Sequence, residues 1–382
     1  MLQKHHHSPE RDKHPDAALE EKDVLIQDGE QEETKQDVKP GSVRTSRNFL
    51  PIIMSWCLVF LCAWLPLSAQ IEGDISLSTQ YSDNVFQLSE YDLDRFDQEH
   101  PNLGYVDTTD DLSLKAQVDL SYPFRHKWYR FEPSITASFD QNVSNTDKWR
   151  RDIIARFAVI RHYWDFKVMY GFYPNILVRA YVDEDGTGEL EHYSYQRNLY
   201  RADLSVKPLE KTTLRAHFRY EELLYNQFFT EFDGDAKTGG IGIRQNFPVF
   251  VLEAGYQYRV FDNWENGSLQ DDSSYESNIY TASLRLKDMP LNDGKSSSPR
   301  WHPSLSLSFE ERFFQGLDDW YGGRVDKIYT TSAGLSFRLN KKWNISLDYS
   351  HYLRNVDSPN ASVRRLKPYS ENRLGAEVKY SL

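Results

Sequence analysis

Cysteine is almost absent from this chain of 382 residues, and both cysteines, Cys57 and Cys62, lie inside one apolar run. We therefore expect no disulfide bonds and no thiol chemistry in the rest of the chain. Long hydrophobic runs are equally scarce. Only residues 49–67 form one, which excludes a bundle of membrane-spanning helices. Phosphate-binding loops, zinc-ligand spacings and nucleophile elbows are also missing, so the sequence predicts neither an enzyme nor a cofactor.

Aromatic and charged residues are both abundant. Aromatic residues make up 14% of the chain and charged residues 27%, while the mean hydropathy is −0.68. This mixture is expected where alternate residues of a strand meet lipid and water. The net charge is −12, and the part after residue 69 keeps an acidic excess, which argues against nucleic acid as a partner.

The chain before residue 70 has two segments of contrasting composition. Residues 1–43 are rich in acids and poor in apolar residues, which predicts disorder or a translation start placed too early. Residues 44–69 have the parts of a signal peptide: Arg44 and Arg47, then an apolar stretch, then small residues ending at Ala69. The mature protein is expected to comprise residues 70–382.

The C-terminal segment alternates apolar and polar residues up to the chain end. Leu374, Val378 and Leu382 would face lipid, while Glu377 and Lys379 would face a polar interior. This segment resembles the closing strand by which bacterial outer-membrane barrels are recognised for insertion, although those usually end in an aromatic residue. The resemblance implies the barrel-assembly machinery as a partner.

The residues from 70 onward divide into about fourteen strands separated alternately by short turns and longer polar loops. An even strand number with both termini on the periplasmic side predicts a transmembrane antiparallel up-and-down β-barrel, with twelve or sixteen strands as alternatives. The predicted strands span residues 73–86, 111–123, 128–142, 150–162, 164–182, 193–207, 212–228, 238–247, 249–262, 275–288, 302–315, 326–340, 343–355 and 368–382.

Tryptophan supports the membrane assignment. An indole ring is most stable at the level of the lipid headgroups, so tryptophans at strand ends indicate two aromatic girdles that contact outer-membrane lipids and lipopolysaccharide. We also expect Phe86 in the outer girdle. The tryptophans at predicted strand ends are Trp128, Trp149, Trp164, Trp264, Trp301, Trp320 and Trp343.

The segment from Ser78 to Phe86 resembles the first strand of bacterial porins and of barrels associated with polysaccharide export or lipoprotein display. The resemblance covers about a dozen residues. It implies either a porin-like channel for small polar solutes or a barrel that assists export or assembly of surface polysaccharides or lipoproteins. It does not distinguish the two.

The inward positions of the predicted strands carry both charges, with more arginine than any other charged residue. Arg201, Arg215 and Arg219 on neighbouring strands are expected to form a basic cluster that favours anionic or sugar-like solutes. The full set of candidate selectivity residues is Arg201, Arg215, Arg219, Glu221, Arg156, Lys115 and Arg285.

The sequence contains candidates for two other types of site. Asp183, Asp185 and Glu189 have the spacing of a divalent-ion loop, although they do not follow the EF-hand order. A membrane hydrolase at the rim would need a serine on the same strand face as a histidine. His351 points outward, but Ser350 precedes it directly and so faces the other way.

Overall fold

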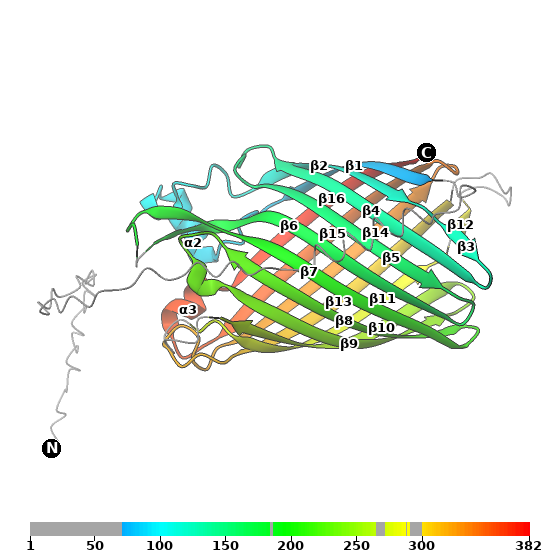
Figure 1. Cartoon of the computed structure of the whole chain (residues 1–382). Helices are drawn as coiled ribbons and strands as arrows, with labels where there is room; N and C mark the ends of the chain where they lie inside the picture. The colour runs from blue at the N-terminus through cyan, green and yellow to red at the C-terminus, as the bar shows by residue number, and fades with distance from the viewer. Residues whose placement is uncertain (1–70, 184–185, 265–271, 288, 291–299) are drawn as a thin grey trace, which may run out of the picture. The chain divides into compact units, whose positions relative to one another are not determined.

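The computed structural model forms a closed antiparallel barrel of fourteen strands (Figure 1), which confirms the predicted fold class. The predicted N-terminal extension and signal peptide lie outside the part that it describes. The described residues are 71–183, 186–264, 272–287, 289–290 and 300–382.

The ring follows the order of the chain, each strand pairing with the preceding and the following one. Two short strands, β3 and β12, pair only with β4 and β13 and lie outside the ring of fourteen. The strands are β1 (Glu72–Ser82), β2 (Asp111–Ser121), β3 (Phe124–His126), β4 (Tyr129–Asn142), β5 (Trp149–Ile160), β6 (Trp164–Val182), β7 (Leu190–Leu209), β8 (Thr212–Tyr225), β9 (Gly234–Asn246), β10 (Phe250–Asn263), β11 (Tyr275–Leu286), β12 (Met289–Pro290), β13 (Arg300–Phe314), β14 (Val325–Arg338), β15 (Trp343–Asp357) and β16 (Tyr369–Ser381).

The first and last strands close the ring. Strand β1 pairs with β16 from Asp74 opposite Ser381 to Ser82 opposite Arg373. The backbone N–H of Leu382 donates to the carbonyl of Gly73 at 2.9 Å. The C-terminal strand therefore closes the barrel as predicted, and the pairing of β1 with β16 satisfies the facing edges of both strands.

Apolar side chains cover the outside of the wall because successive residues of a strand point to opposite faces. Leu114 is 53% exposed, Phe218 54% and Leu374 60%, each at a position predicted to face outward. Such exposure of large apolar residues suits contact with lipid rather than with water. Within the described residues, no helix is long and apolar enough to cross a membrane.

The loop between β1 and β2 lies at one barrel end and contains two short helices (Figure 1). It contains α2 (Glu90–Asp97) and the short helix η1 (Pro101–Leu103). Its core includes Phe86, which is only 3% exposed and packs edge-on against Tyr105 at 5.4 Å between ring centroids. The expectation that Phe86 belongs to the lipid girdle is therefore wrong, because the loop folds back and buries it.

The same end carries η2 (Thr230–Phe232) and α3 (Ala361–Leu366). We call it the outer end, since long loops of such barrels are extracellular. Strand β9 begins at Gly234, four residues before the predicted start at 238. Residues 234–237 are polar and locally typical of a loop, but their pairing with β8 and β10 makes them part of the strand.

Candidate functional site in the barrel lumen

The middle of the lumen wall is lined by small side chains. Gly242 on β9 lies opposite Gly255 on β10, and Ser304 and Ser306 face inward on β13. Both serines are exposed, although Leu305 on the opposite face of the same strand is also 44% exposed. A wall that is accessible on both faces encloses open space, so this level of the barrel is hollow.

Nearer the outer end, one row of inward residues crosses the wall from strand to strand. Each member is the direct register partner of the next, and the row combines three arginines with small hydroxyl residues and one aspartate. We use the name outer belt for this row and for the charged residues that form ion pairs with its members. The row runs Arg219, Thr238, Arg259, Ser277, Arg312 and Asp326.

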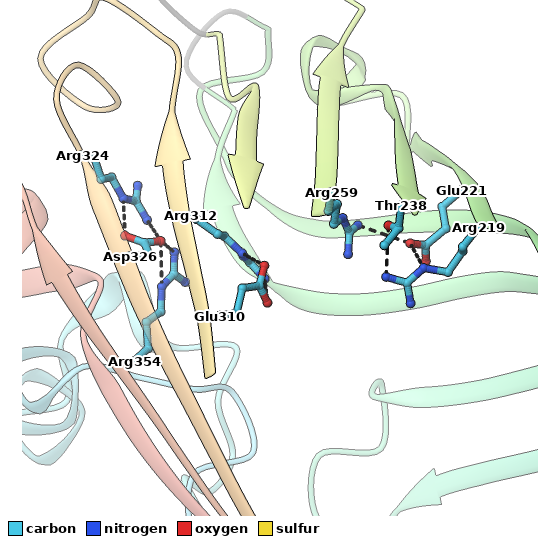
Figure 2. A network of polar contacts seen from close by, with 9 residues as sticks. All are labelled: Arg219, Glu221, Thr238, Arg259, Glu310, Arg312, Arg324, Asp326 and Arg354. Carbon is cyan, nitrogen blue, oxygen red and sulfur yellow. Dashed lines mark hydrogen bonds and ion pairs between the residues drawn. The ribbon is translucent and has the colours of Figure 1, made fainter. Parts of the chain in front are cut away.

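Glu221 gathers the arginines of one half of the belt. Its carboxylate lies 3.1 Å from Nε of Arg219, 3.4 Å from Arg259 and 3.7 Å from Arg197. Figure 2 shows Arg219 and Arg259 converging on it from β8 and β10, with Thr238 between them. Glu221 is only 3% exposed, so one buried carboxylate is shared by three guanidinium groups.

Asp326 organises the other half, as the left side of Figure 2 shows. Arg324 donates two hydrogen bonds to its carboxylate, at 2.9 and 3.0 Å, and Arg354 donates from Nε at 3.1 Å. Asp326 is fully buried. Beside it, Arg312 donates to Glu310 at 2.6 Å.

The outer belt has more arginines than carboxylates, so positive charge remains after pairing. Strand β16 adds the pair Glu371 and Arg373, and Glu371 also accepts a hydrogen bond of 2.6 Å from Ser82 on β1. Arg197, Arg219, Arg259 and the arginines around Asp326 therefore make a closely packed group with a positive surplus.

A second charged group borders the small residues in the middle of the wall, since Arg215 is the register partner of Gly242 and Arg285 is the register partner of Ser304. Glu253 on β10 is contacted by Arg215 at 2.6 Å, by Arg285 at 3.4 Å and by Arg244 at 3.5 Å. We call this group the inner cluster. It also holds more guanidinium groups than carboxylates.

The predicted basic cluster is divided between these two levels. Arg201 lies directly opposite Arg219 in the sheet and pairs with Asp203, whereas Arg215 belongs to the inner cluster. The four-residue spacing along β8 separates Arg215 from Arg219 by about 13 Å. The sequence placed all three in the lumen but did not show that they serve different levels.

The other candidate lumen residues also line the inside. Arg156 donates to Thr136 at 2.7 Å, Lys115 lies opposite Asp140 in register, and Arg285 reaches Glu253. Sequence reasoning missed Arg312, Arg324, Asp326 and Arg354 as site residues. A usable signal existed: arginine and a carboxylate two residues apart share one strand face, as in Arg324 and Asp326.

A cavity of about 710 Å³ lies at the outer end, and we call it the outer cavity. Its lining includes Tyr193, Phe232 and Trp320 as well as Arg179 and Lys367. Trp320 therefore lines a cavity, whereas the girdle prediction placed it in lipid. The remaining predicted tryptophans lie at or next to strand ends, Trp128 with 82% exposure.

Neither of the two further site types is assembled among the described residues. Asp185 lies outside them, and Asp183 accepts a backbone hydrogen bond from Thr187 at 2.7 Å. No group of three or more potential metal ligands occurs in the described ranges. His351 is held at Nδ1 by Asn372 at 2.9 Å, while Ser350 bonds to Ser332 on the lumen side.

No protein-family model matches the sequence, and no curated protein matches it. Solved structures that resemble it include an anion-selective porin from Comamonas acidovorans, with 8% identity, a TM-score of 0.42, and coverage of 82% of this chain and 99% of the porin. The outer-membrane channel DcaP of Acinetobacter baumannii has 12% identity and a TM-score of 0.44, and the match covers 82% of this chain and 97% of DcaP. A bacterial polysaccharide outer membrane secretin has 8% identity and a TM-score of 0.42, and the match covers 81% of this chain and 98% of the secretin.

These likenesses do not choose between import and export. The assignment of the barrel rests on its own geometry: a closed ring, an apolar outer face and a polar interior. The protein is a β-barrel of the bacterial outer membrane.

Proposed function

We propose that this barrel is a passive channel for small polar solutes and that its outer belt favours anions. The observation that carries the proposal is the hollow middle of the lumen, where Ser304 and Ser306 are exposed on the inside of the wall. Serine and glycine leave room for water and offer hydroxyl groups to a passing solute. They also provide no apolar surface along which an apolar solute could pass.

The anion preference follows from the surplus of arginine in the outer belt and in the inner cluster. Three guanidinium groups share Glu221 in the outer belt, and three share Glu253 in the inner cluster. Unpaired positive charge next to a low-dielectric wall raises the local concentration of anions.

The test is the current through purified, refolded barrels in a planar bilayer under a KCl gradient. We expect a reversal potential on the anion-selective side. Replacing Arg201, Arg215 and Arg219 together with Gln should move it toward cation selectivity, since lumen substitutions tune selectivity while the wall stays intact. Retained heat-modifiable gel mobility confirms that the variant folds.

A matched control removes the same charge outside the lumen. Arg161→Gln, Lys211→Gln and Lys341→Gln change exposed inner turns and should leave the selectivity nearly unchanged. An equal shift in both variants would refute a role for the lumen arginines. Folded wild-type barrels that pass no current would overturn the channel, and the role in exporting surface polysaccharides or lipoproteins would then take its place.

A further inference from the structure

The outer cavity has the size and walls of a small-molecule site. Its volume of about 710 Å³ lies within the range of ligand pockets. One side is a continuous aromatic wall centred on Tyr193, whose ring centroid lies 5.0 Å from that of Phe229, 5.2 Å from Tyr181 and 5.4 Å from Phe232. Such a wall favours a ligand with a flat or ring-shaped body.

One cation in the cavity has only aromatic partners. The ammonium group of Lys367, just after α3, lies 4.9 Å from the ring centroid of Trp320 and 5.6 Å from that of Tyr181. Among the described residues, no carboxylate is within ion-pair distance of it. Burial away from water lowers the pKa of Lys367; Tyr181 acts against this, and nearby arginines, Arg179 first, lower the pKa further. A bound anion would supply the missing counter-charge.

The other cations of the cavity are already committed. Arg179 donates to the carbonyl oxygens of Phe86 and Gln87 and lies 3.6 Å from Asp92, so it fastens the first outer loop to β6. Arg95 lies 3.7 Å from the same Asp92. Lys367 is therefore the cation of this cavity that remains available for a ligand.

The cavity also limits the ligand's charge. Asp183 and Glu231 line it in addition to the ion-paired Asp92, and a second anionic group on the ligand would face carboxylates. A ligand with one negative charge avoids this repulsion, and hydroxyl groups on its ring would meet acceptors instead.

We infer that the outer cavity binds a small monocarboxylate that carries a ring, with its carboxylate on Lys367 and its ring against Tyr193. An aromatic acid and a uronic acid share this chemistry. The inference rests on residues outside the outer belt and inner cluster, and it deepens the proposed channel by giving it a recognition site at the entrance.

The test measures equilibrium binding to the full-length folded barrel in detergent by calorimetry and by quenching of tryptophan emission. Benzoate represents aromatic acids and glucuronate uronic acids, with benzamide and glucose as their uncharged counterparts. We expect saturable binding of at least one acid, about tenfold tighter than its uncharged counterpart. Binding of benzoate alone identifies an aromatic acid, and binding of glucuronate alone identifies a sugar acid. If neither acid binds more tightly than its counterpart, the inference is wrong.

Substitutions locate the site. Lys367→Met should weaken binding of the acid about tenfold and leave the uncharged counterpart unaffected. Lys148→Met is the matched control, because Lys148 also lies on an aromatic ring, that of Phe86 at 4.6 Å, but does not line the cavity. Full affinity in the Lys367 variant, or equal losses in both variants, would refute the assignment.

Binding and conduction are independent readouts of the same preparation. A barrel that conducts but binds neither acid would remove this inference and leave the channel in place. A barrel that binds an acid but carries no current would remove the channel and leave the site.

Discussion

Removing the charge of Asp326 should destabilise the barrel much more than removing the charge of a similar pair elsewhere in the lumen. Asp326 is fully buried, and its partners Arg324 and Arg354 are 3% and 20% exposed. Asp326→Asn keeps the size of the side chain but leaves two guanidinium groups without their shared counter-charge. Breaking a buried pair in this way costs about 3–5 kcal/mol, and the partial exposure of Arg354 suggests about 3 kcal/mol here.

The matched control is Asp203→Asn. Asp203 and Arg201 form the same kind of pair, two residues apart on one strand face, but they are 28% and 40% exposed. Water screens such a pair, so we expect a loss of under about 1 kcal/mol. Stability can be measured as urea-induced equilibrium unfolding in phospholipid vesicles, followed by tryptophan emission. If the two variants differ by less than about 0.5 kcal/mol, the burial of the outer belt does not control its energetics and the reasoning fails.

Two further predictions concern the ends and the outer loops. Deleting residues 379–382 should prevent assembly, because it removes part of the pairing between β16 and β1 and leaves backbone groups unpaired in lipid; a truncated chain that keeps heat-modifiable gel mobility would contradict this. Burial lowers the pKa of Lys148 to about 8. Since an unfolded lysine titrates near 10.4, the unfolded chain holds the extra proton between these values, so stability should rise from pH 8 to pH 10.5 and stay level below pH 8. The rise should be about 1–2 kcal/mol, and its persistence in Lys148→Met, measured by the same urea titration at pH 7 and pH 10, would rule out this lysine as the cause.

The sequence determined the wall of the barrel. Strand positions, the inward or outward direction of Leu114, Phe218 and Arg219, and closure by the last strand all follow from a period of two residues. This period is a local property, so it can be read from one segment at a time. Both faces of a transmembrane strand are also chemically distinct, which makes the alternation of apolar and polar residues unusually clear.

Only the tertiary structure decided which inward residues meet. Arg219, Arg259 and Arg312 form one row because the register between four successive strand pairs aligns them, and no single strand contains that information. The same register separated Arg215 from Arg219. Shifting one strand by two residues would keep every side chain on its predicted face and still dissolve the belt.

The positions of aromatic residues in the outer loops could be predicted from the sequence even less well than the contacts between lumen residues. Phe86 and Trp320 looked like lipid anchors in the sequence, yet one lies in the core of a loop and the other beside Lys367 in a cavity. Loops have no fixed period: Phe86 is buried by its own loop, where it packs on Tyr105, and Trp320 meets Lys367 from a different outer loop. The wall was therefore set by local alternation, and the candidate binding site by long-range packing that only the closed barrel brings together.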